Sequence, residues 1–257
     1  MLHVERACRL LRRRRGGCRG GQGQSGERHE VQRERSAESA AAGHGSSFRN
    51  GVDGHGRSIV SRRPPLLHCP GVSFDDLPRP TTLVHAPRLS AVLGAAVTLV
   101  AETFQETGSF KFRAAWNVVR AAPSQAFLTV SSGNFGQALA RAAALAGKRA
   151  IVAMPATSAA VKVAAVRHWG AQVELLDPAR ESRAAGLARL AAAYPEAYVA
   201  SPYDDPLVIA GNASLGREIA ALGRDRFDDV VVPVGGGGLA AGVATGLAEA
   251  GSRARLL

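Results

Sequence analysis

The sequence predicts an α/β fold in which helices cover a parallel sheet, and three observations support this. Apolar runs of about five residues alternate with alanine-rich segments of helical length from about residue 97 onward. Such alternation is typical of βαβ units. The composition, 46% hydrophobic and 21% charged, is that of a chain with a folded core. The sequence contains no run of 18 apolar residues, so no membrane-spanning helix is predicted.

The expected strands follow one another at residues 97–100, 127–130, 150–154, 172–176, 197–200 and 230–234. Helices are expected at residues 107–120, 135–146, 158–169, 179–194, 206–223 and 239–250. Gly147 and Gly170 end two of these helices, and Pro155 closes a strand. The segment 230–234 is almost wholly apolar, so we expect a central strand that is buried on both faces. Ligands of parallel sheets bind at the carboxyl ends of the strands, so the loops there are the first candidates for a site.

Residues 1–70 differ from the rest of the chain in composition. They hold 14 arginines, no lysine and six acidic residues, and they carry most of the net charge of +11. Because no apolar period persists there, we expect a disordered leader rich in Arg, Gly and Ser. An arm that binds phosphates non-specifically and coding sequence begun too far upstream are the alternatives. Cys8, Cys18 and Cys69 all lie in this segment, so a disulfide scaffold and a Cys-based zinc site are excluded from the rest.

Lys111 stands out among the basic residues. The chain has three lysines against 29 arginines, and Lys111 lies between Phe110 and Phe112, directly after a strand and a turn. Lysine, unlike arginine, loses its proton when it is desolvated. The neutral amine is a nucleophile that forms an imine with an aldehyde. A solvated lysine on a helix surface is the alternative interpretation.

Two further loops at strand ends are made of small residues, and each leads into a helix. Ser131, Ser132 and Asn134 can cap their helix, bind a carboxylate at its N-terminus, or do both. The four glycines at 235–238 let the backbone approach an anion closely, which favours a small phosphate monoester over a flexible turn. The patterns of nucleoside-triphosphate and dinucleotide loops are both missing here.

A pair of carboxylates precedes another expected helix. Asp204 and Asp205 stand before Pro206, which is a favourable first helical residue. Paired carboxylates can act as acid and base or as metal ligands. Capping of the helix by at least one of them is the simpler interpretation.

Six motifs in one order resemble those of the fold-type II pyridoxal-phosphate enzymes, in the branch of serine/threonine dehydratases and serine racemase. The motifs are QETGSFKFR (105–113), SSGNFGQALA (131–140), GKRAIVAMP (147–155), KVAAVRHWGAQVEL (162–175), YDDPLVIAGNASLGREI (203–219) and VPVGGGGLAAGVA (232–244). The resemblance runs from about residue 74 to residue 257. It implies a tryptophan-synthase-β-like fold with two parallel or mixed-sheet subdomains and flanking helices. The enzyme domain would span residues 71–257, with a small subdomain inserted at about 116–200.

The resemblance also implies a role for each matching residue. Lys111 would hold pyridoxal 5'-phosphate as an imine and would act as the base at the substrate α-carbon. Ser132, the second catalytic residue, matches the acid–base position that racemases of this type use on the opposite face. The residues implied to bind the cofactor are Phe110, Lys111, Asn134, Gly235, Gly236, Gly237, Gly238 and Leu239. Those implied to bind the substrate carboxylate are Ser131, Ser132, Gly133 and Asn134. No metal site is implied within the chain.

The implied activity is that of an ammonia-lyase (dehydratase) that converts L-threonine or L-serine to a 2-oxo acid and ammonia. The sequence SFKFR at 109–113 favours this branch, because cysteine-synthase relatives usually carry a Lys-Asp-Arg run. A serine racemase and a β-replacement enzyme such as threonine synthase or cysteine synthase are the alternatives among enzymes. A non-catalytic protein is the alternative outside them, either a truncated remnant that binds the cofactor or a nucleic-acid binder with an Arg-rich tail.

The chain departs from the family pattern at three positions and at its end. Phe135 stands where many relatives have His, Ala114 replaces a frequent Gly, and Asn212 replaces a frequent Gln. The family continues past its tetraglycine loop with further strands and a Ser or Cys at the pyridine nitrogen, so we expect a C-terminal truncation. The implied partners are a small amino-acid substrate and, in the complete enzyme, a second copy in a homodimer. We expect a cytoplasmic protein with no membrane partner and with nucleic-acid contact only through the leader.

Overall fold

The computed structural model describes residues 77–223 and 226–257. All of them belong to one compact unit of the chain. The disordered leader expected at residues 1–70 lies outside the described residues. Within the described residues, no helix is both long enough and apolar enough to cross a membrane.

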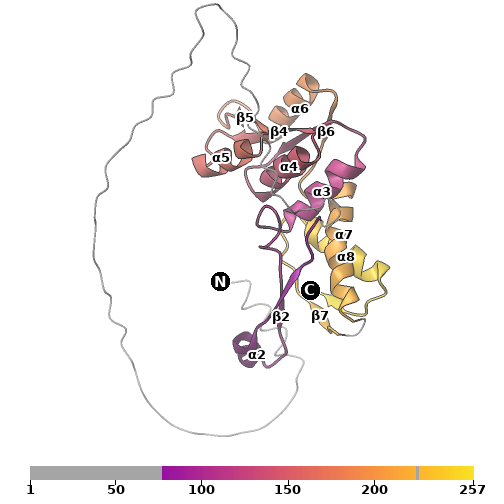
Figure 1. The fold of residues 1–257 in the computed structure, drawn as a ribbon. Helices are drawn as coiled ribbons and strands as arrows, with labels where there is room; N and C mark the ends of the chain where they lie inside the picture. The colour runs from indigo at the N-terminus through magenta and orange to yellow at the C-terminus, as the bar shows by residue number, and fades with distance from the viewer. Residues whose placement is uncertain (1–76, 224–225) are drawn as a thin grey trace, which may run out of the picture. The chain divides into compact units, whose positions relative to one another are not determined.

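A four-stranded parallel sheet occupies the middle of the chain (Figure 1). Its strands are β3 (Ala126–Val130), β4 (Arg149–Pro155), β5 (Gln172–Leu176) and β6 (Ala197–Val199). The helices that follow these strands are α4 (Asn134–Leu145), α5 (Ala160–His168), α6 (Arg183–Ala193) and α7 (Pro206–Ala221). The spatial order of the strands is β5-β4-β3-β6, and all three neighbouring pairs are parallel. The predicted parallel α/β organisation is therefore confirmed.

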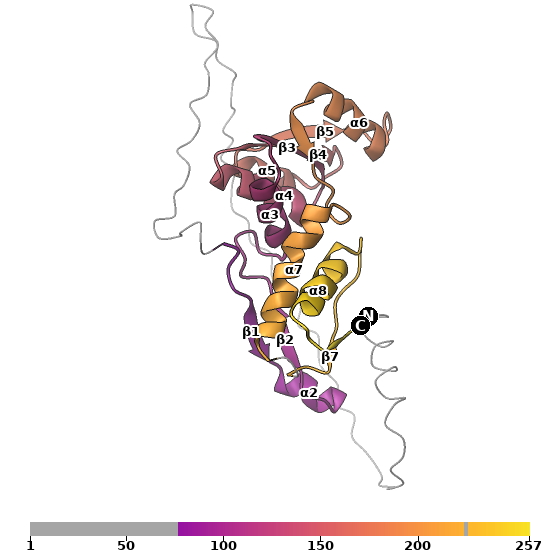
Figure 2. The ribbon, with the colours of Figure 1, turned by 90° about the vertical axis from the view of Figure 1, so that its right-hand side faces the viewer.

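Alternation of side chains along β3 and β4 gives this sheet two apolar faces. Phe127 and Val152 belong to a cluster with residues of α3 (Lys111–Ala121), α4 and α5. Leu128 and Ile151 belong instead to a cluster with Leu190 of α6. Figure 2 shows α6 on the side of the sheet away from α4. Both faces are thus covered, as is usual for a parallel sheet.

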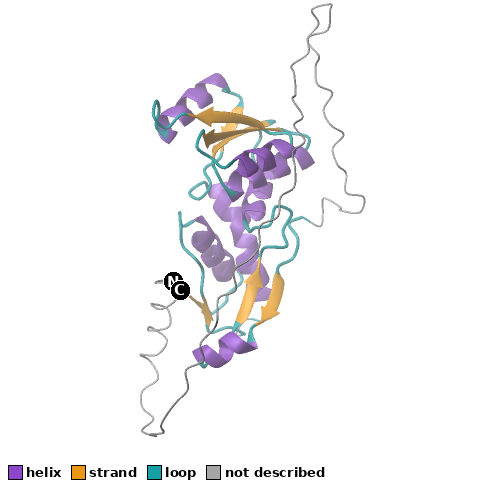
Figure 3. Cartoon of the chain, turned by 90° about the vertical axis from the view of Figure 1, so that its left-hand side faces the viewer, coloured by secondary structure: helices purple, strands orange, loops and turns teal. Residues whose placement is uncertain are grey.

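Two small sheets complete the fold. Strands β1 (Thr82–His85) and β2 (Thr98–Ala101) pair antiparallel and are connected through α2 (Pro87–Leu93), as Figure 3 shows. Strands β7 (Asp229–Val230) and β8 (Arg255–Leu256) pair in parallel, with α8 (Gly238–Glu249) between them in the sequence. Neither β1 nor α2 was predicted from the sequence, because both are short and contain no buried residue.

Helices α7 and α8 pack with their backbones in contact and lie side by side in Figures 1 and 2. A Cβ added at Gly242 or Gly246 of α8 would come within 3.0 Å of backbone atoms of α7. Gly216 of α7 approaches the backbone of α8 equally closely. Side chains such as Leu215 and Val243 form an apolar cluster beside this contact.

Two predicted helices begin four residues later than expected. Helix α3 starts at Lys111 and not at Thr107, because the residues before it form turns that include Gly108 at a φ of 71°. Helix α6 starts at Arg183 and not at Ala179. The Ser182 side chain caps it by accepting a hydrogen bond from the helix backbone.

The central strand expected at residues 230–234 is a wrong prediction. Strand β7 ends at Val230 and pairs only with β8 among the described residues. Val231 and Val234 are 63% and 70% exposed. Apolar composition predicted a strand with neighbours on both sides, but within the described part of the chain it has one.

Candidate active site

The strand order creates a topological switch point between β3 and β6. The chain runs from β3 outward through β4 to β5 and then returns to the other side of β3 as β6. In open parallel sheets, ligands bind at such a point, outside the carboxyl ends of the strands. The loops at this point are the serine loop (residues 131–134) after β3 and the proline loop (residues 201–205) after β6. The Thr129 hydroxyl donates to the Ala200 carbonyl at 2.8 Å and joins the two strand ends.

Lys111, the first residue of α3, extends its amine to this switch point. Its Nζ donates a hydrogen bond to the carbonyl of Pro202 in the proline loop, at 2.6 Å. The same atom lies 5.1 Å from the ring centre of Phe110 and 5.7 Å from that of Phe135, which follows the serine loop. Burial lowers the pKa of Lys111, so its neutral, nucleophilic form is populated at lower pH than that of a solvated lysine.

The first residue of the serine loop accepts hydrogen bonds from the start of α4. The hydroxyl oxygen of Ser131 accepts hydrogen bonds from the backbone N–H groups of Gly136 at 3.1 Å and Gly133 at 3.4 Å. Ser132 and Gly133 are half-buried, and Asn134 is exposed. The N-cap residue of α4 is Gly133, so Ser131 supports the first turn from outside the helix, while binding of a substrate carboxylate by this loop stays a prediction.

The glycine loop (residues 235–238) leads into α8 and is closed on one side by Tyr203 of the proline loop. A Cβ at Gly236 would come within 3.0 Å of the Tyr203 side chain, and a Cβ at Gly238 within 3.0 Å of the Tyr203 backbone. Gly237 has a φ of 86°, in the left-handed region that favours glycine. At Gly235 a Cβ would meet nothing within 4 Å. No side chain among the described residues caps α8, so the N–H groups of its first turn are open to an anion.

Helix α7 holds the first turn of α8 in place. Asn212, which is fully buried, donates from Nδ2 to the carbonyl of Gly238 at 3.1 Å. Leu239 packs against the apolar cluster between the two helices. The glycine loop is therefore fixed from two directions, by Asn212 and by Tyr203.

The paired carboxylates of the proline loop serve the local structure. Asp205 accepts from the backbone N–H of Leu207 at 2.7 Å and caps α7, and it also accepts from the Tyr198 hydroxyl at 3.1 Å. Asp204 accepts a hydrogen bond from the Ser201 hydroxyl. The capping interpretation is confirmed for Asp205. Within the described residues, no group of three His, Cys, Asp or Glu side chains could hold a metal ion.

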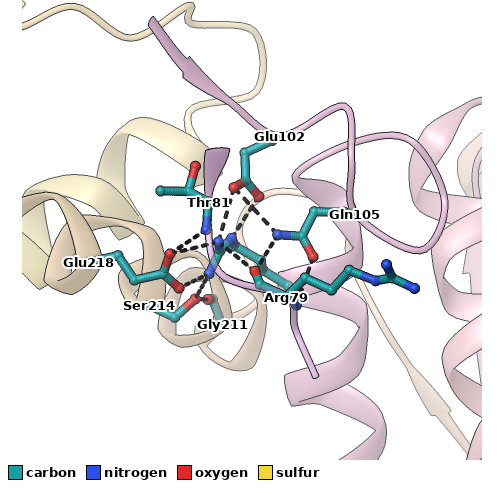
Figure 4. Close-up of polar contacts among 8 residues, drawn as sticks. Arg79, Thr81, Glu102, Gln105, Gly211, Ser214 and Glu218 are labelled. Carbon is teal, nitrogen blue, oxygen red and sulfur yellow. Dashed lines mark hydrogen bonds and ion pairs between the residues drawn. The ribbon is translucent and has the colours of Figure 1, made fainter. Parts of the chain in front are cut away.

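A buried arginine that was not singled out from the sequence, Arg113, fastens the start of α3. Figure 4 labels its partners Glu102, Ser214 and Glu218. The side chain of Arg113 is fully buried and donates to Glu102 at 2.6 and 2.9 Å and to Glu218 of α7 at 2.6 and 3.1 Å. Its remaining acceptors are the Ser214 hydroxyl and the Arg79 carbonyl, each at 3.1 Å. Because Arg113 follows Lys111 by two residues, these contacts fix the helical turn that carries the amine.

The lysine loop (residues 102–110), which leads to Lys111, is held at a further point. The side chain of Gln105 accepts from the Arg79 N–H at 3.1 Å and donates to the Arg79 carbonyl at 2.7 Å. Closer to Lys111, the hydroxyl oxygens of Thr107 and Ser109 are buried and have no hydrogen-bond partner among the described residues.

A comparison with protein families decides the identity of this site. Residues 74–257 match the family described as pyridoxal-phosphate dependent enzyme. The chain belongs to this family. The match includes Lys111 and the serine, proline and glycine loops, and it confirms the resemblance that the six motifs indicate.

Individual members of the pyridoxal-phosphate family show similarity to more than half of the chain. An L-threonine ammonia-lyase of Geobacter sulfurreducens is 36% identical over 183 residues, which are 70% of this chain and 45% of that protein. A serine racemase of Mus musculus is 36% identical over 180 residues, covering 67% of this chain and 52% of that protein. The structure of maize serine racemase superposes with a TM-score of 0.64 at 29% identity, covering 68% of this chain and 54% of that one. The chain thus spans about half the length of the relatives it matches.

The cofactor of the family is pyridoxal 5'-phosphate, and the residues at the switch point fit it. Its aldehyde requires a desolvated amine, which Lys111 provides. Its phosphate monoester requires backbone N–H donors and room for close approach, which the glycine loop and the start of α8 provide. The two groups lie on connected loops, because Lys111 donates to Pro202 and the next residue, Tyr203, packs against the glycine loop.

Proposed function

We propose that this chain carries the lysine, carboxylate-binding and phosphate-binding parts of an ammonia-lyase that acts on L-threonine or L-serine. One observation carries the proposal, namely the desolvated amine of Lys111 at the β3–β6 switch point, between the serine loop and the loop that contacts the glycine loop. The relatives named threonine ammonia-lyase and serine racemase support an amino-acid substrate.

Each loop has one task in the proposed reaction. When bound, pyridoxal phosphate supplies an electron sink for the substrate α-carbon. The neutral Nζ of Lys111 removes the α-proton, and the rings of Phe110 and Phe135 keep the amine desolvated. The serine loop holds the substrate carboxylate at the N-terminus of α4, through its N–H groups and the Ser132 and Asn134 side chains. The β-hydroxyl leaves as water and one water is taken up again, so the products are a 2-oxo acid and ammonia.

Borohydride reduction tests the assignment of the amine. The chain is incubated with pyridoxal phosphate, reduced and digested, and the modified peptide is identified by mass spectrometry. Lys148 is the matched control, because its Nζ also donates to a carbonyl at 2.6 Å and lies 5.4 Å from the Phe127 ring, but at the amino end of β4. We expect modification at Lys111 and none in Lys111→Arg. Modification of Lys148 to the same extent contradicts the assignment.

Product analysis on L-serine and L-threonine tests the reaction. Pyruvate or 2-oxobutanoate with equimolar ammonia supports the lyase. D-Serine without ammonia supports the racemase, and a β-substituted amino acid supports a β-replacement enzyme. The racemase is the second candidate, because relatives with this name match the chain and Ser132 is half-buried at the end of β3. In that case Ser132→Ala abolishes D-serine formation and spares modification of Lys111.

The remaining proposals concern assembly and location. We propose a homodimer for the complete enzyme, a cytoplasmic location, and contact with nucleic acid only through residues 1–70. A small subdomain at about 116–200 is supported by the four-stranded sheet, whose strands all lie between residues 126 and 199. Light scattering of the purified protein tests the dimer, and limited proteolysis near these boundaries tests the subdomain.

A further inference from the structure

Glu106, in the lysine loop, joins two parts of the site through its carboxylate. One oxygen accepts from Arg79 at 2.6 and 3.0 Å, and the other accepts from Arg141 of α4 at 3.1 Å. The Glu106 side chain is only 8% exposed, as is that of Arg141, whereas that of Arg79 is 51% exposed. The pair with Arg141 is therefore a buried ion pair, and the pair with Arg79 lies at the surface.

The buried charge of Arg141 is balanced by its contact with Glu106. Within the described part of the chain, Glu106 is the one carboxylate that pairs with it. Its guanidinium stacks 4.4 Å from the ring centre of Trp169, and its Nε is buried without a partner among the described residues. A buried guanidinium with one counter-ion holds that counter-ion firmly, because separation leaves both charges desolvated.

The pair links the two loops that must act together. Glu106 precedes Lys111 by five residues in a loop whose end is fixed by the Arg113 contacts. Arg141 lies seven residues after Asn134 on α4, which places it about 10 Å along the helix from the serine loop. A helix of this length behaves as a rigid rod, so fixing Arg141 also fixes the N-terminus of α4 relative to Lys111.

We propose that Glu106 is a positioning residue that, through Arg141, sets the distance between the Lys111 amine and the serine loop. This inference rests on the proposed function for its catalytic consequence, since the amine and the carboxylate-binding loop must meet one substrate molecule. The competing explanation is that apolar packing of α4, through residues such as Leu139 and Ala142, already fixes the helix.

Four variants separate these explanations. Glu106→Gln and Arg141→Gln each remove one partner of the buried pair, and the double variant removes both without leaving a charge behind. Arg79→Gln is the matched control, because it removes the exposed partner of the same carboxylate and keeps the backbone contacts to Gln105. The deciding measurement is hydrogen exchange of the amides of residues 131–137 in the chain without cofactor, compared with those of β3.

We expect exchange at residues 131–137 to become about tenfold faster in Glu106→Gln and Arg141→Gln, with little change in β3 or in Arg79→Gln, since one charged hydrogen bond is lost. The double variant should be no faster than the faster single variant. Equal acceleration in β3 and the serine loop, or no change, overturns the proposal in favour of packing alone.

Steady-state kinetics provide a second readout that depends on turnover. KM for the amino acid should rise about tenfold while kcat changes less, because a displaced loop binds the carboxylate less well. A failure of the proposed function is recognised separately, as absence of the borohydride adduct at Lys111 in the unsubstituted chain. The exchange result still decides the role of Glu106 in that case.

Discussion

Substitution of Gly246 by alanine tests the close contact of α7 and α8 most directly. An added Cβ would lie 2.8 Å from the backbone nitrogen of Arg217 and 2.9 Å from the Cα of Gly216, and closer still to the carbonyl of Ala213. These are backbone atoms, so no side chain can rotate away. Overpacking of this kind costs about 1–3 kcal/mol. Alanine recovers about 1 kcal/mol of helix propensity. Because three backbone atoms are involved, we expect a net loss of about 2 kcal/mol, at the upper end of these estimates.

Urea unfolding measured by circular dichroism gives the stability, and Ala244→Gly is the control. Ala244 is exposed on the same helix, so its change to glycine removes about 1 kcal/mol through propensity alone. Gly246→Ala should also weaken the binding of pyridoxal phosphate, because α8 begins at the glycine loop. If Gly246→Ala is as stable as the unsubstituted chain while Ala244→Gly is destabilised, the close contact does not exist and the reasoning is refuted.

Four other predictions follow from the site. Arg113→Met leaves the carboxylates of Glu102 and Glu218 without their shared counter-ion, and we expect a loss of about 3 kcal/mol in urea unfolding. Asp205→Ala removes the cap of α7, which should lower stability by about 1 kcal/mol in the same assay, whereas Asp205→Asn should lose less. The rate of aldehyde addition to Lys111 should rise with pH around a midpoint below the ordinary lysine pKa of about 10.4, because burial lowers the pKa of this amine; a midpoint at or above that value contradicts the desolvation. Burial of Glu106 acts to raise its pKa, but hydrogen bonds to Arg79 and Arg141 outweigh this and lower it, so the stability that Glu106 contributes is lost as pH falls through the lowered pKa. Glu106→Gln should therefore show a flatter acid limb in thermal melts recorded from about pH 5 downward, because the loss begins near the ordinary glutamate pKa of about 4.3 and continues below it.

Local patterns predicted the sheet and the loops at its carboxyl edge. The strand at 172–176 has the predicted bounds, and Lys111, the serine loop and the glycine loop all follow strands or turns as expected. This succeeds because hydrophobic periodicity and glycine placement act over a few residues. The same local signals predicted a helix cap at Asp204 or Asp205, and in the structure the cap is Asp205.

Long-range pairing could not be predicted in this way. Arg113 stands in the motif that contains Lys111, but its partner Glu218 lies 105 residues away, and no local pattern connects them. Glu106 and Arg141 are likewise 35 residues apart. The error at Val231 and Val234 has the same origin, because composition reports how apolar a segment is but not which neighbours cover it.

The switch point also affects when the site forms during folding. The bond between Thr129 and Ala200 spans 71 residues, and the bond between Lys111 and Pro202 spans 91. Closure of such long loops lowers the entropy of the chain before the contacts compensate for it, so these pairings form late. The β3–β4 pair and α4 can assemble earlier, from residues that are close in sequence. On a ribosome, the amine of Lys111 would be synthesised long before the carbonyl that receives it, and it would stay solvated and protonated until β6 joins the sheet.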